Sequence, residues 1–143
     1  MVSYSRIVAA IDLTDDSRAV LERAADLARQ WQAQLLLVHI VEFVPIEPMS
    51  DSLVPVVQVD ERLVERARVQ LQTLAGAAGV PPDCLRVTSG NVKIELLHIA
   101  RDWQADLIVL GSRERHGLSI LVNLTEDTVL HAAPCDVLAV RVR

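Results

Sequence analysis

Short aliphatic runs alternate with longer stretches of helical periodicity along nearly the whole chain, and this alternation restricts the fold more than any other feature. The runs are apolar at every position, which is typical of strands covered on both faces in a parallel sheet. In the longer stretches apolar residues recur every three or four positions, as on a helix that buries one face. The expected strands are 6–12, 34–41, 85–88, 106–111 and 135–142, and the expected helices, with their capping residues, are 14–31, 59–78, 91–103 and 123–132.

This order of elements predicts a single α/β domain over residues 1–143. Because crossovers between parallel strands are right-handed, we expect an open, five-stranded, doubly wound parallel sheet with strand order 3-2-1-4-5 and helices on both faces. Ligands of such sheets bind outside the carboxyl ends of the strands, at the point where the strand order reverses. Here that point lies between the first and fourth strands, at Asp12 and Gly111.

Local sequence also predicts details of the connections. Asn91 has the side chain of a helix cap, and Ile94, Leu97 and Ala100 are expected to face inward from the helix that it begins. Residues 14–17 offer capping side chains to the first helix. The prolines of segment 42–58 predict a long loop there, of the kind that is functional or mobile.

The composition excludes several classes of protein. The formal net charge is −5 and aromatic residues make up 3% of the chain, so the basic surface and stacking platforms of nucleic-acid-binding proteins are missing. No apolar run approaches the ~20 residues of a membrane span, and no secretion signal precedes the first strand. Cys84 and Cys135 lack metal-ligand spacing and fit a reducing compartment. We therefore expect a cytoplasmic protein without a metal site, membrane association or nucleic acid partner.

The stretch from Gly111 to Thr125 follows a strand and precedes a helix. A loop in this position can direct backbone N–H groups and the helix dipole at an anion. Glycine allows the backbone to approach a phosphate closely. Alternatively, a glycine after a strand is only a turn residue.

Four segments resemble the universal stress protein family. They are Val8-Ala9-Ala10-Ile11-Asp12 and the stretches 37–40, 106–112 and 133–140, so the resemblance covers essentially the whole chain. It implies a five-stranded fold of the adenine nucleotide alpha hydrolase-like type, and a homodimeric, stress-induced cytoplasmic regulator.

One branch of that family binds ATP through a motif of Gly, two residues, Gly, eight or nine residues, and then Gly followed by Ser or Thr. Gly111 matches the first glycine, whereas the second falls on Glu114 and the third on Asn123, followed by Leu124. The resemblance places Asp12 near the ribose and Ile40 against the adenine. The nucleotide-contacting positions that it implies are Asp12, Ile40, Gly111, Ser112, Arg113, Arg115, Gly117, Asn123 and Thr125.

The departures from the motif weaken the expected site. Glu114 places a carboxylate where a triphosphate should lie, and a like-charge contact at ~4 Å costs about 1–4 kcal/mol. Leu124 removes a hydroxyl donor, although Arg113 and Arg115 could each meet a phosphate. The chain thus resembles the UspA branch, which lacks the glycines. We expect a non-catalytic protein that needs no cofactor and binds nucleotide weakly or not at all; the alternative is a functional ATP- or AMP-binding protein.

Other residues have simpler interpretations. His39 is expected to be a core histidine bound to the backbone, and Asp12 could be a structural cap of the next turn instead of a ligand contact. No nucleophile–base pair is evident, so we expect no catalytic residue. A phospho-acceptor receiver domain is disfavoured, because the third strand ends without an acidic residue and the fifth without a lysine.

The last strand should lie at an edge of the sheet. An exposed aliphatic edge between Val137 and Val142 is a liability unless it is paired, and pairing with a second copy would form a two-fold homodimer. The family resemblance implies the same contact. Alternatively, Arg141 and Arg143 simply keep the edge soluble.

Overall fold

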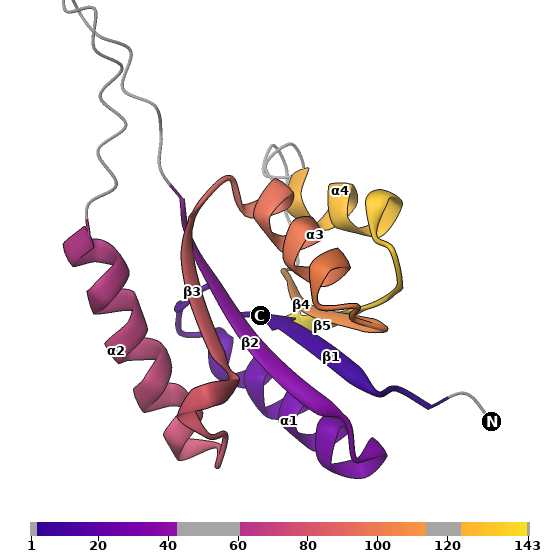
Figure 1. Ribbon diagram of the computed structural model, residues 1–143, viewed down its shortest axis with the longest axis horizontal. Helices are drawn as coiled ribbons and strands as arrows, with labels where there is room; N and C mark the ends of the chain where they lie inside the picture. Colours follow the sequence, from indigo (N-terminus) through magenta and orange to yellow (C-terminus); the bar gives the residue numbers. More distant parts are fainter. Residues whose placement is uncertain (1–2, 43–60, 114–123, 143) are drawn as a thin grey trace, which may run out of the picture.

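Five parallel strands form one sheet in a computed structural model that describes residues 3–42, 61–113 and 124–142 (Figure 1). The sheet order is β3-β2-β1-β4-β5, and every pairing is parallel, as the sequence predicted. The strands are β1 (Arg6–Ala10), β2 (Gln34–Glu42), β3 (Leu85–Gly90), β4 (Leu107–Arg113) and β5 (Asp136–Val142). The expected loop 42–58 lies almost entirely outside the described residues.

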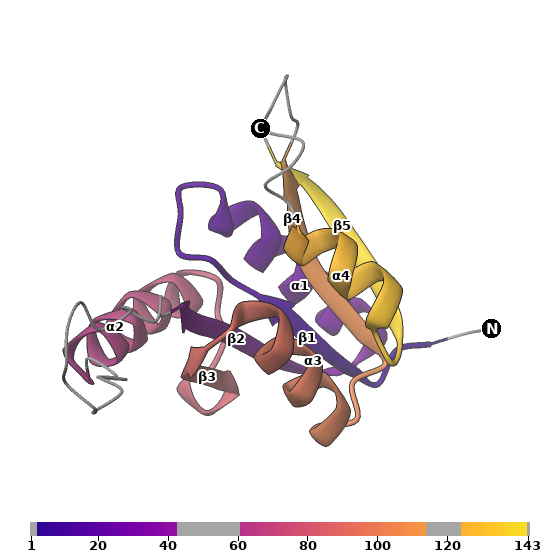
Figure 2. The same cartoon turned by 90° about the horizontal axis from the view of Figure 1, so that it is seen from above.

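Four helices and one short 3-10 turn connect the strands. They are α1 (Ser17–Trp31), α2 (Glu61–Ala77), η1 (Pro82–Cys84), α3 (Val92–Asp102) and α4 (Leu124–Ala132). Helices α1 and α2 cover one face of the sheet, and α3 and α4 cover the other (Figures 1 and 2). None of the helices in the described part of the chain has the length and apolar character needed to cross a membrane.

The central strands are buried on both faces, which is why their sequences are apolar throughout. Alternate residues of a strand point to opposite faces. Ile7 and Leu37 accordingly belong to the core beneath α1 and α2, whereas Val8, Val38 and Ile40 belong to the core beneath α3 and α4. Because these strands are apolar throughout, polar groups at the sheet are expected at the strand ends, including the carboxyl ends.

Helix α3 begins as predicted, but one of its side chains was placed wrongly. The Asn91 side chain accepts hydrogen bonds from the N–H groups of Lys93 at 3.0 Å and Ile94 at 3.2 Å. Ile94 is 58% exposed, because it lies two positions, about 200° around the helix, from the fully buried Leu96. The buried residues of this helix are Leu96, Ile99 and Ala100.

The start of α1 differs from the expectation of a side-chain cap. Its N-cap residue is Asp16, whose side chain makes no capping hydrogen bond. The preceding turn is held by other groups: the Ser17 hydroxyl donates to the Thr14 carbonyl oxygen at 2.5 Å, and Asp12 accepts from Thr14. Leu13, which lies between Asp12 and Thr14 in the sequence, has a φ of 60°, a conformation that is uncommon outside glycine.

Candidate functional site

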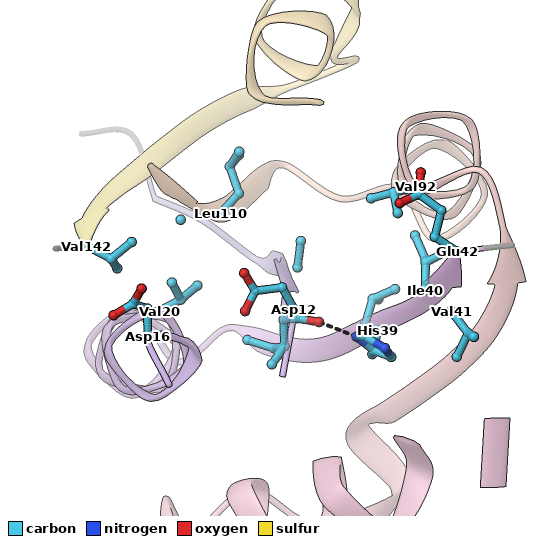
Figure 3. Close-up of a pocket in the computed structure, with 14 residues that line it drawn as sticks. Asp12, Asp16, Val20, His39, Ile40, Val41, Glu42, Val92, Leu110 and Val142 are labelled. Atoms are coloured by element: carbon cyan, nitrogen blue, oxygen red, sulfur yellow. Dashed lines mark hydrogen bonds between the residues drawn. The ribbon is translucent and has the colours of Figure 1, made fainter. Parts of the chain in front are cut away.

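A cavity of about 480 Å³ lies at the carboxyl ends of β1, β2 and β4. From β1 the chain continues to β2, toward one edge of the sheet, whereas from β4 it continues to β5, toward the opposite edge. The strand order therefore reverses between β1 and β4. The volume lies within the range of about 300–1,000 Å³ that is usual for small-molecule sites. The lining residues are Ala10, Ile11, Asp12, Asp16, Val20, Val38, His39, Ile40, Val41, Glu42, Val92, Leu110, Gly111 and Val142 (Figure 3).

Asp12 lines the cavity and also holds the turn after β1. Its Oδ1 atom accepts hydrogen bonds from the Thr14 N–H at 3.1 Å and the Thr14 hydroxyl at 2.7 Å. The structural role considered for Asp12 is therefore confirmed.

His39 is half-buried and bound to the backbone, as predicted. Its Nδ1 atom lies 2.7 Å from the carbonyl oxygen of Ile11 (Figure 3). A carbonyl oxygen only accepts, so Nδ1 carries the proton of this bond, and Nε2 of the neutral ring is an acceptor. The contribution of His39 to the cavity wall was not foreseen from the sequence.

Gly111 is fixed by packing. It lies within β4, which continues to Arg113 rather than ending at the glycine, and it pairs with Val140. A Cβ atom added there would lie 3.2 Å from Cγ2 of Val20 and 3.7 Å from Cγ2 of Val142. Gly111 therefore permits close contact of α1 and β5 with β4, a requirement that exists with or without a ligand.

The other predicted site residues are distributed unevenly. Ile40 lies in the cavity wall, 7% exposed, whereas Ser112 pairs with Arg141 in the sheet and is absent from the cavity wall. Arg113 ends β4 and Thr125 belongs to α4, and the positions of their side chains are not described. Three predicted residues lie outside the described residues: Arg115, Gly117 and Asn123.

Among the cavity-wall residues that sequence reasoning missed, three lie where strands end or helices begin. Asp16 precedes α1, Glu42 ends β2 and Val92 begins α3. All of them follow or end a strand at the carboxyl edge of the sheet, and that position is the signal that could have found them.

Apart from the imidazole of His39, the side chains of the described cavity wall are acidic or apolar. Asp12, Asp16 and Glu42 are its carboxylates, and no lysine or arginine is among the described residues that line it. No cluster of three or more potential metal ligands occurs within residues 3–42, 61–113 and 124–142.

The sheet order and the crevice at its reversal point define an open, doubly wound α/β protein. The profile of the universal stress protein family matches residues 3–141. The chain belongs to the universal stress protein family, which confirms the resemblance seen in its motifs.

Relatives agree over the full length of the chain. Universal stress protein A homolog 2 of Coxiella burnetii is 35% identical over 144 residues, covering 100% of this chain and 99% of the relative. The structure of UspA from Lactobacillus plantarum has a TM-score of 0.74 at 23% identity and covers 99% of this chain and 100% of its own. A universal stress protein in complex with cAMP has a TM-score of 0.68 at 19% identity, with 97% and 98% covered. At these identities the two solved structures support the fold alone.

The packing role of Gly111 predicts a loss of stability in Gly111→Ala. The added methyl group lies 3.2 Å from Val20, and overpacking of this kind typically costs about 1–3 kcal/mol. Chemical denaturation of both proteins measures the difference. Val20→Ala in the same chain should recover part of it, since the obstructing methyl group is removed.

Gly76→Ala is the matched control. Gly76 lies in α2, and a Cβ added there meets no atom within 4 Å. Alanine in this helix should therefore stabilise the protein, by about 0.5–1 kcal/mol. Equal effects at the two glycines would contradict the packing role of Gly111.

Cys135 should be an unreactive thiol. Burial, with the nearby carboxylates of Asp136 and Asp106, raises the pKa of Cys135 to about 11 from 9.0. The folded chain thus retains a proton that the unfolded chain loses, so this group favours folding below pH ~9 and its contribution disappears as the pH rises toward ~11. In a Cys84→Ser variant, alkylation of the remaining thiol should become fast only near pH 11. Rapid alkylation at pH 8 would disprove the inert role.

Proposed function

We propose that the protein is a non-catalytic, homodimeric stress-response regulator of the cytoplasm whose crevice binds adenine nucleotides weakly. The observation that carries the proposal is the cavity at the carboxyl ends of β1 and β4, with Asp12 and Ile40 in its wall. These are the two positions outside the glycine loop that the family motif assigns to ribose and adenine. The proposal that residues 1–143 form a single domain agrees with a family match that spans 3–141.

Binding of a nucleotide is supported by the shape of the cavity and by one relative. The wall offers apolar side chains from β2, α3 and β4 to a flat ring, among them Ile40, Val92 and Leu110. A universal stress protein of the same fold has been solved with cAMP. We extend that ligand class to this chain because the cavity occupies the reversal point of the sheet, where this architecture holds its ligands.

Weak binding is supported by charge. Asp12, Asp16 and Glu42 line the cavity, and the sequence places Glu114 at the second glycine of the motif. Each carboxylate within ~4 Å of a phosphate costs about 1–4 kcal/mol, and about 1.4 kcal/mol corresponds to a tenfold loss of affinity. Even one such contact would therefore lower the affinity about tenfold or more.

The absence of catalysis is proposed from the chemistry of the described wall. No serine or cysteine is among its described residues, and His39 donates from Nδ1 to a backbone carbonyl rather than to a carboxylate. A nucleophile with an adjacent, oriented base is the usual requirement for covalent catalysis.

The proposed dimer contact is the outer edge of β5. This strand lies at the end of the sheet order, so its outer backbone groups have no strand beside them within the described chain. Val140 and Val142 point into the core, whereas Ala139 and Arg141 are exposed. Pairing of the segment from Val137 to Val142 with the same strand of a second copy would satisfy these backbone groups.

Calorimetric titration with ATP tests the nucleotide proposal. We expect a dissociation constant above about 100 µM, because of the repulsion described above, and no release of phosphate over background. Val92→Phe should abolish the remaining binding by filling the cavity. The same substitution at Val69, which is exposed on α2, should leave it unchanged. A dissociation constant near 1 µM would contradict weak binding.

Sedimentation or light scattering tests the dimer. Ala139→Lys adds a charge to the exposed side of the β5 edge, so we expect a shift toward monomer at low micromolar concentration. Thr88→Lys adds a charge at a half-buried position of β3, the opposite edge strand, and should leave the mass unchanged. A monomeric parent protein, or loss of the dimer in Thr88→Lys alone, would refute the β5 contact.

A further inference from the structure

We propose that His39 is a positioning residue of the crevice: it holds the carbonyl oxygen of Ile11 and thereby keeps the N–H of Ile40 out of the β1–β2 ladder, free to donate to a ligand. This inference rests on the proposed function, because it takes an adenine compound as the acceptor of that hydrogen bond. It adds the side chain that keeps a backbone donor available in the cavity.

The pairing of β1 with β2 ends before β2 does. The last registered pair is Ala10 with Val38, and one further hydrogen bond joins the Ile11 N–H to the Val38 carbonyl oxygen at 2.8 Å. Strand β2 continues to Glu42 and stays paired with β3 over this length. The last residues of β2 therefore have the cavity, rather than β1, on their other side.

The next hydrogen bond of the ladder can be deduced from its geometry. Along a strand, alternate residues direct their backbone N–H and C=O groups toward the same neighbouring strand. The Val38 carbonyl is bonded to β1, so the N–H of Ile40, two residues later, is directed to the same side. Its regular partner would be the carbonyl oxygen of Ile11. Among the described residues this hydrogen bond is not formed, and the register of the two strands stops at Val38.

The side chain of His39 takes the place of that missing bond. Its Nδ1 atom donates to the Ile11 carbonyl oxygen at 2.7 Å (Figure 3). A buried backbone carbonyl requires a hydrogen-bond partner, and the imidazole supplies one without using the backbone of β2. The turn formed by Asp12 and Thr14 follows directly and leads into α1. Strand β1 can therefore leave the sheet at Ile11 with its last carbonyl satisfied.

The Ile40 N–H is thus a donor in the wall of the cavity. Ile40 is 7% exposed and lines the cavity, and an N–H in such a place is costly unless water or a ligand accepts from it. The ring nitrogens of an adenine compound are acceptors, and the side chains of Ile40, Val92 and Leu110 offer aliphatic contacts to its ring. The unpaired donor and the apolar wall together suit a flat ring that carries acceptor atoms.

Amide hydrogen exchange, followed residue by residue by NMR, tests the ladder without any ligand. In the parent protein we expect the Ile40 amide to exchange at least about tenfold faster than that of Val38, which lies within the ladder. His39→Leu removes the donor, so the Ile11 carbonyl becomes available to Ile40, whose exchange should slow. His39→Asn has nearly the shape of leucine but keeps a side-chain N–H, and should retain fast exchange. An Ile40 amide that is protected in the free parent protein, or unchanged by His39→Leu, would overturn the inference.

Titration with AMP, followed by the same amide signals, tests the use of the free N–H. We expect the Ile40 amide to become protected as AMP binds. His39→Leu should weaken AMP binding about three- to tenfold, the usual contribution of one hydrogen bond, whereas His39→Asn should bind nearly as the parent does. His98→Leu is the matched control: His98 is exposed on α3 and absent from the cavity wall, so both the exchange at Ile40 and the affinity should stay unchanged.

The outcomes separate this inference from the proposed function. AMP binding that leaves the Ile40 amide unprotected, or that is equally strong in His39→Leu, would overturn the role of His39 while leaving the nucleotide site in place. Failure of both AMP and ATP to bind would overturn the proposed function itself, and with it the use of the Ile40 N–H by a ligand.

Discussion

Burial of the sheet on both faces is the constraint on which the rest of the structure depends. Two layers of helices cover β1, β2 and β4, so their side chains are committed to one core or the other. The ends of the strands are then the places where charged groups remain near the sheet. At the amino-terminal end these groups are used for structure: Asp106 accepts hydrogen bonds from the N–H groups of Ser5 and Arg6, and Arg6 donates to the Trp103 carbonyl oxygen. At the carboxyl end they surround the crevice.

The fold could be predicted from the sequence because its signal is repeated in every element. Each apolar run indicates a buried parallel strand, and right-handed crossovers leave few possible orders for five of them. The error at Ile94 shows the limit of this reasoning. Apolar residues occur on both sides of α3, and only the orientation of the helix on β2 and β3 decides that Leu96 and Ile99 are buried.

The crevice could be predicted only in part. Asp12 and Gly111 were found because the predicted strand order reverses there, and Ile40 because the family resemblance marks it; all three line the cavity. Asp16, Glu42 and Val92 come from three different connections, and no local pattern relates a helix start to the end of a distant strand. The orientation of His39 by the Ile11 carbonyl likewise depends on a contact across 28 positions of the chain. The acidic character of the wall follows from this convergence and is not visible in any single segment.

The contact of Gly111 with Val20 has a consequence for how glycine signatures are interpreted. Helix packing and anion binding are two independent reasons for a glycine at this backbone position. Without an anion, the packing against Val20 still disfavours a side chain at this position. The neighbouring positions Glu114 and Asn123 carry side chains where the motif has glycine. A lone glycine of such a signature therefore indicates only a packing requirement. The positions that differ from the motif, here Glu114 and Asn123, say more about the ligand than Gly111 does.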